Sequence, residues 1–91
     1  MNRLRRAKGR PHAGAYPYQI DLIPPFEGFD DAVEEEIIQF LEHRAGAFDV
    51  YGQIANGDAF IRYRFANLAD AEAFHARFAP SAEKAIFKKV E

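Results

Sequence analysis

The chain has 91 residues, a formal net charge of −2 at pH 7 and no cysteine. This length supports one hydrophobic core, so we expect a single domain. Without cysteine the chain can form no disulfide, no thiol nucleophile and no thiolate-held metal site. It has no apolar stretch of membrane-spanning length and no apolar signal segment, so we expect a cytoplasmic domain without a membrane partner.

The charge is distributed unevenly along the chain. Residues 1–15 hold five basic residues and no acidic one, which gives +5, and residues 16–91 hold seven basic and 14 acidic residues, which gives −7. The five basic residues are Arg3, Arg5, Arg6, Lys8 and Arg10. Because this segment has too little apolar surface to offset the entropy of ordering, we predict a flexible basic arm over 1–15 and a folded domain over 16–91.

The first two predicted elements are a strand and a helix. YPYQIDLIPP alternates apolar and polar residues through Tyr18, Ile20 and Leu22, and ends at two prolines, which indicates a half-buried strand. FDDAVEEEIIQFLEHRAG has apolar residues at helical spacing. These are Val33, Ile37, Phe40 and Leu41. Asp31 with Glu34 predicts a capping-box start, and Gly46 predicts the C-terminal cap.

A hairpin follows, centred on Asn56-Gly57, which is typical of a two-residue type I′ turn. Such a turn predicts the register of the two strands. On one face it pairs Phe48 with Phe65, Val50 with Tyr63, Gly52 with Ile61 and Ile54 with Ala59. On the other face it pairs Asp49 with Arg64, Tyr51 with Arg62 and Gln53 with Phe60. The first face is apolar, so we expect it to lie against the helices.

A second helix and a last strand complete the chain. NLADAEAFHARFAP predicts a helix with Asn67 as its N-cap and Pro80 at its end. Its predicted buried stripe consists of Leu68, Ala71, Phe74 and Phe78. EKAIFKKVE predicts a short strand with two open alternatives: either Ala85 and Phe87 point to the helices, or Ile86 and Val90 do.

The predicted order β-α-β-β-α-β is that of the ferredoxin-like fold. It is an α+β two-layer sandwich, in which two right-handed crossovers place both helices on one face of a four-stranded antiparallel sheet. We expect the strand order 4-1-3-2. The other face of the sheet is then open, and function has to be sought on it.

The segment ANGDAFIRYRF and the helix start ANLADAEAF resemble the third strand and second helix of an RNA-recognition motif, whose aromatic residues stack on bases. In this resemblance Phe60 and Arg62 occupy the two positions of the stacking aromatics. The first strand carries Gln19 and Asp21 where an aromatic residue would be expected, and Ala59 replaces a glycine. YPYQ, RYRF and AEAFHARF are also similar to segments of small uncharacterised bacterial proteins.

The candidate binding surface is therefore the open face, with the residues Asp21, Tyr51, Gln53, Phe60, Arg62 and Arg64. We expect Asp21 beside Arg62, Asp49 opposite Arg64, and a cation–π contact between Tyr51 and Arg62. Apolar residues set among paired charges suit a protein interface, so we favour a non-enzymatic interaction or regulatory module whose partner is a protein, with a second copy as the preferred candidate.

Two alternatives stay open. In the first, the basic arm binds RNA or another polyanion together with Phe60, Arg62 and Arg64, and the affinity falls with salt. In the second, the protein is a cofactor-free α+β-barrel enzyme that uses Tyr63 and His75 in a pocket between sheet and helices. We expect no cofactor and no metal site, because the three histidines lack the spacing of a metal motif.

Overall fold

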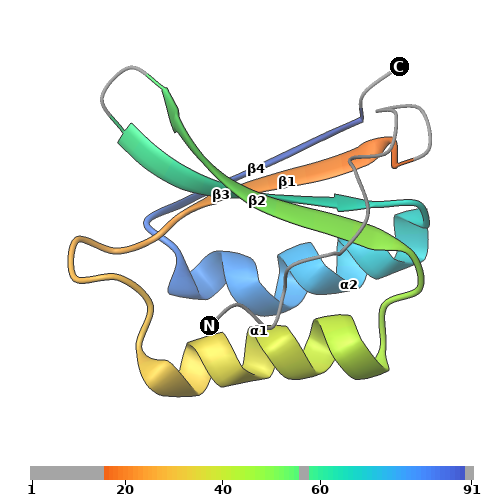
Figure 1. Cartoon of the computed structure of the whole chain (residues 1–91), viewed down its shortest axis with the longest axis horizontal. Coiled ribbons are helices and arrows are strands. Elements are labelled where there is room, and N and C mark those ends of the chain that lie inside the picture. Colours follow the sequence, from red (N-terminus) through yellow and green to blue (C-terminus); the bar gives the residue numbers. More distant parts are fainter. Residues whose placement is uncertain (1–15, 56–57, 90–91) are drawn as a thin grey trace.

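The computed structural model describes residues 16–55 and 58–89 and has an α+β architecture (Figure 1). Its elements are β1 (Tyr18–Ile23), α1 (Asp31–His43), β2 (Phe48–Ala55), β3 (Asp58–Phe65), α2 (Leu68–Phe78), a 3-10 turn η2 (Ala79–Ser81) and β4 (Lys84–Lys89). The predicted order of strands and helices is confirmed. The predicted basic arm, the Asn56-Gly57 turn and Val90 lie outside the described residues.

The four strands form one antiparallel sheet in the order β2-β3-β1-β4. Both helices pack on the same side of it, so the opposite side forms the open face (Figure 1). The predicted hairpin register is confirmed along its whole length, from Phe48 opposite Phe65 to Ala55 opposite Asp58. β3 and β1 are the inner strands, and they bring Arg62 opposite Asp21 and Tyr63 opposite Ile20.

The N-cap of α1 is one residue earlier than predicted. The Asp30 side chain accepts a hydrogen bond from the Val33 backbone N–H at 3.2 Å, and Asp31 is the first helical residue. Asp30 takes this role because its backbone is extended, which lets its carboxylate turn back over the first turn. In α2 the predicted N-cap Asn67 is confirmed, since its side chain accepts from the Ala69 and Asp70 backbone N–H groups.

Gly46 does not cap α1, contrary to the prediction. The C-cap is Arg44, and the N–H groups of Arg44 and Ala45 both donate to the Phe40 carbonyl at 2.9 and 3.0 Å. Gly46 instead donates its backbone N–H to the Asp70 carboxylate at 2.9 Å. This bond ties the residues that follow α1 to the first turn of α2.

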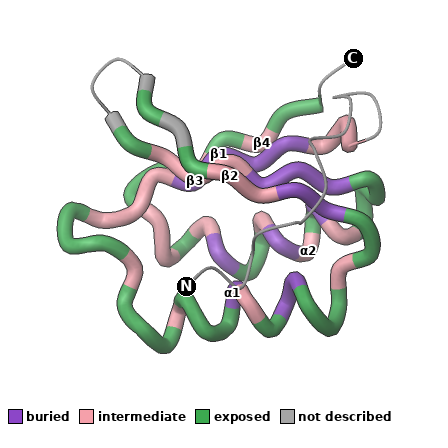
Figure 2. The backbone as a smooth tube through the Cα atoms, viewed as in Figure 1, coloured by how far each residue is buried: buried purple, intermediate pink, exposed green. Residues whose placement is uncertain are grey.

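The core lies between the sheet and the two helices and is centred on Phe74, which is 0% exposed. The Phe74 ring centroid lies 4.6 Å from that of Tyr63, 5.2 Å from that of Phe65 and 4.9 Å from that of Phe78. Figure 2 shows buried residues along the strands and on the sides of both helices that face the sheet. These tilted ring contacts hold α2 to β3 over the middle of the sheet.

The facing of β4 is settled in favour of the first alternative. Ala85 and Phe87 are partly buried against the core, opposite Leu22 and Ile20, whereas Ile86 is 41% exposed on the open face. Sequence alone left both alternatives open because β4 carries large apolar residues on each side.

Two residues predicted for the apolar face or stripe are exposed. Ile54 is 78% exposed because the hairpin end of β2 and β3 curves away from the helix layer, so no helix covers it (Figure 1). Leu68 is 44% exposed because it occupies the first position of α2. The helical period places Leu68 on the correct stripe, but the helix layer ends there.

Phe74→Ala is expected to lower the free energy of unfolding by about 3–5 kcal/mol, because it leaves a cavity where several aromatic rings meet. Leu68→Ala, a matched change on the same helix, is expected to cost less than about 1 kcal/mol because Leu68 is half-exposed. Urea unfolding of both variants measures the difference. Similar losses for the two would contradict this description of the core.

Candidate functional site

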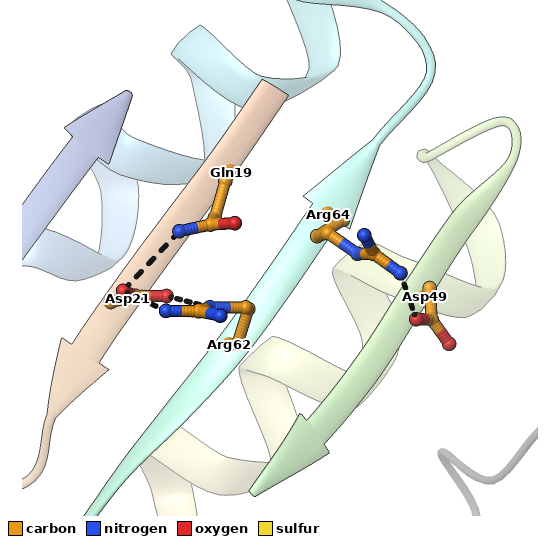
Figure 3. A network of polar contacts seen from close by, with 5 residues as sticks. All are labelled: Gln19, Asp21, Asp49, Arg62 and Arg64. Atoms are coloured by element: carbon orange, nitrogen blue, oxygen red, sulfur yellow. Dashed lines mark hydrogen bonds and ion pairs between the residues drawn. The ribbon is translucent and has the colours of Figure 1, made fainter. Parts of the chain in front are cut away.

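The predicted site residues lie on the three strands β1, β3 and β2, and Figure 3 shows Asp21, Arg62 and Arg64 among them. Asp21 comes from β1, Arg62, Arg64 and Phe60 from β3, and Tyr51 from β2. Gln53 lies opposite Phe60 in the β2–β3 register, and its side chain is outside the described part of the structure. The period of two along each strand therefore brings the predicted residues to one side of the sheet.

Arg62 and Asp21 form a two-pronged ion pair between β3 and β1. The Arg62 Nε donates to Asp21 Oδ1 at 2.8 Å and its terminal nitrogen donates to Asp21 Oδ2 at 3.0 Å. Gln19 adds a longer bond from its amide nitrogen to Asp21 Oδ2 at 3.4 Å. The hydrogen bond to Asp21 raises the pKa of the Arg62 guanidinium above its ordinary value, so Arg62 stays charged and directed at Asp21.

Arg64 extends in the opposite direction from β3 and pairs with Asp49 on β2 (Figure 3). One terminal nitrogen of Arg64 donates to Asp49 Oδ2 at 3.1 Å, and the two side chains are 9% and 7% exposed. The Arg64 Nε is buried and has no hydrogen-bond partner within the described part of the chain. A buried guanidinium donor without an acceptor costs free energy in the folded protein.

Two aromatic rings cover the arginines. The guanidinium carbon of Arg62 lies 5.2 Å from the Phe60 ring centroid, and that of Arg64 lies 5.5 Å from the Tyr51 ring centroid. Tyr51, for which a cation–π contact with Arg62 was predicted, has its ring against Arg64 and also faces Arg62 in the register. Arg62 extends toward Asp21 on β1, and a hydrogen bond with the Tyr51 side chain contributes to its raised pKa.

The polar centre of the open face is buried, although no helix covers it. Counted over the whole residue, backbone included, Gln19 is 5% exposed, Asp21 8%, Asp49 5% and Arg64 7%. The predicted pairs of Asp21 with Arg62 and of Asp49 with Arg64 are confirmed. Buried charges are tolerated in proteins when they are paired, as these are.

β4 adds residues to the open face that sequence reasoning did not assign to it. Ile86 lies opposite Asp21, with Lys88 opposite Gln19 and Lys84 opposite Ile23. The charged residues thus alternate in sign across the sheet: acidic on β2, basic on β3, acidic on β1 and basic on β4. Once Ala85 and Phe87 are known to face the helices, the alternation of side chains assigns Lys84, Ile86 and Lys88 to this face.

The two candidate acid–base residues, Tyr63 and His75, line neither of the two surface pockets described in the next paragraph. Tyr63 is 2% exposed in the core against Phe74, and the His75 ring lies 5.4 Å from that of Phe87. Burial, with a smaller contribution from Glu34, raises the pKa of the Tyr63 hydroxyl above its ordinary value. A tyrosine whose pKa is raised in this way is a weaker acid than a free one.

Two surface pockets are open to solvent and are lined by residues other than Tyr63 and His75. One, of about 550 Å³, is lined by Pro25–Asp30, Val33 and Ser81, and the other, of about 610 Å³, by Pro24, Gly52, Ile54, Ala59, Phe60 and Ile61. Within residues 16–55 and 58–89, no group of three or more His, Asp or Glu residues is arranged to hold a metal ion. No helix in the same ranges is long and apolar enough to cross a membrane.

Comparison of the chain with protein families, with curated proteins and with solved structures found no match. The open face therefore has to be interpreted from its own geometry.

Asp49→Ala is expected to lower the free energy of unfolding by about 3–5 kcal/mol, because it leaves the buried charge of Arg64 without its carboxylate. Adding Arg64→Leu is expected to recover most of that loss, since both charges are then gone. The control is Glu36→Ala, which breaks an ion pair with Arg77 whose side chains are more than half exposed and should cost less than about 1 kcal/mol. Equal losses for Asp49→Ala and Glu36→Ala in urea unfolding would show that the Asp49–Arg64 pair is not buried.

The raised pKa of Tyr63 predicts how stability depends on pH. Above about pH 10, the ordinary pKa of tyrosine, the unfolded chain loses this proton while the folded protein keeps it, so stability falls as pH rises further. Tyr63→Phe removes this contribution. Its free energy of unfolding should decline less steeply above pH 10 than that of the wild type, by up to about 1.4 kcal/mol per pH unit. Parallel pH profiles for the two proteins would contradict the burial of the hydroxyl.

Proposed function

We propose that the protein is a non-enzymatic interaction module of ferredoxin-like fold, and that its open face binds the open face of a second copy. The observation that carries this proposal is the alternation of charge across the four strands, with each inner arginine already paired to a carboxylate in its own chain. The apolar side chains between the charges also support it.

Paired charges suit a surface that is covered by another protein. When a sheet face is buried, every unpaired charge on it costs free energy, whereas charges already paired within the chain lose less on burial. Arg62 and Arg64 are held by Asp21 and Asp49, and their guanidinium groups also lie against aromatic rings. Arginines held in this way are less available to phosphate groups, which disfavours the open face as a polyanion site.

The pattern of charge is complementary to itself. Consider a second copy whose open face lies on the first, related to it by a two-fold axis that runs parallel to the strands and passes between β3 and β1. The β4 strand of the second copy then lies over β2, and its β1 strand lies over β3. Each acidic strand then faces a basic strand. Such aligned packing of two sheets is a common arrangement, with about 10 Å between them.

The two-fold rotation keeps each residue at its position along the strands. Residues that lie side by side in the register of one sheet are therefore also the ones that face each other between the two sheets. Arg62 would face Asp21 of the second copy, Tyr51 would face Ile86, and Asp49 would face Lys88. Arg64 would face Gln19 of the second copy. The three contacts made by Arg62, Asp49 and Arg64 each join a base or donor to an acid or acceptor.

Apolar residues supply the rest of the contact. Ile86 is 41% exposed, and Phe60, Tyr51 and Ile23 are partly exposed on the same face. In the arrangement above Phe60 lies near Ile23 of the second copy, in continuation of the β1–β3 register. An aromatic and aliphatic centre among paired charges is typical of the core of a protein interface.

Phe60→Glu and Ile86→Glu are each expected to weaken self-association at least tenfold, because each buries an unpaired carboxylate in the interface. Ala76→Glu, which adds the same charge on the exposed side of α2, is the control and should leave association unchanged. Sedimentation of the full chain over a concentration series measures the effect, and near-identical unfolding curves show that the variants are folded.

Self-association that is the same in Phe60→Glu, Ile86→Glu and Ala76→Glu would contradict the proposal. RNA binding by the full chain that is lost in Phe60→Ala but retained in a chain beginning at Ala15 would favour the nucleic-acid alternative for the open face. RNA binding that disappears with residues 1–14 would assign it to the basic segment alone.

A further inference from the structure

We propose that Phe26, on the loop between β1 and α1, inserts into an apolar pocket at the hairpin end of β2 and β3 in a second copy, which returns the same contact. This hairpin pocket is lined by Pro24, Gly52, Ile54, Ala59, Phe60 and Ile61. Of the residues that form the proposed open-face contact, only Phe60 lines it, so the two contacts can be tested apart.

Phe26 is held outward by a fixed turn. It is 102% exposed, so its ring lies fully in water. The Gly28 backbone N–H donates to the Pro25 carbonyl at 2.7 Å and closes a β-turn in which Phe26 is the second residue, and Gly28 ends this turn with a φ of +85°. Phe29, which is partly buried against the core, fixes the loop after the turn. Because the turn is already ordered, a partner that covers the ring loses little affinity to the cost of ordering it.

The hairpin pocket has the size and the chemistry to take this ring. Its volume of about 610 Å³ lies within the range of roughly 300–1,000 Å³ that is usual for pockets enclosing a small ligand. None of its six lining residues has a charged or hydrogen-bonding side chain, and Ile54 at its rim is 78% exposed. The other surface pocket is lined by Glu27, Asp30 and Ser81 and by Phe26 itself, so it is a poorer receiver for an aromatic ring.

The ring and the pocket lie next to each other in each copy, which is the condition for a reciprocal contact. Pro24 lines the pocket and Phe26 follows two residues later, so their Cα atoms are at most about 7 Å apart. Figure 1 shows the β1–α1 loop and the hairpin end of β2 and β3 at the same end of the molecule. A single two-fold axis between ring and pocket can therefore place each ring in the pocket of the other copy. A second copy accounts for both the exposed ring and the open pocket, whereas an unrelated partner accounts for only one of them.

The charges beside the ring and the pocket are complementary. Residues 24–31 hold three acidic residues and no basic one, and Glu27 among them is exposed. Lys84, exposed at the start of β4, lies opposite the last residue of β1, directly before Pro24 of the pocket. Insertion of the ring brings Glu27 of one copy toward Lys84 of the other. Glu83, next to Lys84, lessens this attraction, so the apolar contact supplies most of the affinity.

Sedimentation of the full chain in an Ile86→Glu background isolates this contact, because Ile86 lies on the open face and does not line the hairpin pocket. We expect the Ile86→Glu chain still to form a dimer as concentration rises. Adding Phe26→Lys or Ile54→Glu should weaken that dimer by about tenfold or more, since each places a charge in an apolar contact. Both positions are largely exposed, so the variants should unfold like their parent. Ala76→Lys, on the exposed side of α2, is the control and should leave the dimer unchanged.

Mixing the two variants gives the sharpest test of reciprocity. In a mixed dimer the intact ring of the Ile54→Glu copy enters the intact pocket of the Phe26→Lys copy, and the introduced lysine meets the introduced glutamate. Phe26→Lys and Ile54→Glu should therefore associate with each other about tenfold or more tightly than either associates with itself. Two variants that fail to rescue each other would show that residue 26 does not face the pocket of the other copy.

Phe26→Trp reports directly on where the ring lies, because the chain has no tryptophan and the substitution supplies a single fluorophore. Its emission should shift to shorter wavelength as concentration rises, and adding Ile54→Glu should abolish the shift. A shift that is the same at all concentrations would place the ring in the pocket of its own chain. No shift while the chain associates would place the contact elsewhere, and either result overturns the proposal.

The outcomes separate this contact from the open-face contact. An Ile86→Glu chain that stays monomeric while the wild type forms a dimer would overturn the Phe26 contact and support the open face. A wild-type dimer that is unaffected by Ile86→Glu and lost in Phe26→Lys would support the Phe26 contact and overturn the open face.

Discussion

The structure depends on β3, an inner strand with an apolar side that packs in the core and a charged side that lies on the open face. One side carries Tyr63 and Phe65 into the core, and the other carries Arg62 and Arg64 onto the open face. Because β3 lies between β2 and β1, each arginine has one neighbouring strand from which a carboxylate can reach it. Asp21 and Asp49 supply these carboxylates, and the two pairs hold three strands together on the side that no helix covers.

This arrangement explains how a polar centre can be buried on an uncovered sheet. A guanidinium that is bonded to a carboxylate and lies against an aromatic ring loses little when water is removed from it. In the proposed function, the same property favours a protein partner over a phosphate backbone, whose binding requires available cations. The alternating sign of the four strands adds a further constraint, since it matches a copy of the same face turned over about the strand direction.

Much of the fold could be predicted from the sequence where local signals agreed. The Asn56-Gly57 pair predicted the register of the hairpin, and the apolar period predicted most of the buried stripe of each helix. The N-cap of α1 was predicted at Asp31 because Glu34 follows it at capping-box spacing, whereas the extended backbone of Asp30, which the sequence does not show, makes Asp30 the cap. The exposure of Ile54 depends on how far the helix layer extends, and the alternation within one strand carries no information about that.

The candidate site was predicted in its composition and less well in its contacts. The pairs of Asp21 with Arg62 and of Asp49 with Arg64 follow from register alone. The choice of ring for each arginine depends on side-chain rotamers, which register does not determine. Ile86 and its flanking lysines could be assigned to the open face only after the facing of β4 was known.

The most direct test of the open-face contact is an isotope-filtered NMR experiment on a mixture of labelled and unlabelled full-length chain. The face-to-face arrangement predicts magnetisation transfer between the methyl groups of Ile86 in one copy and the Tyr51 ring of the other. Within one chain these residues lie on the two outermost strands, β4 and β2, so such a signal has to arise between copies. If the chain associates at the concentration used and no transfer between Ile86 and Tyr51 is seen, the open face is not the contact surface.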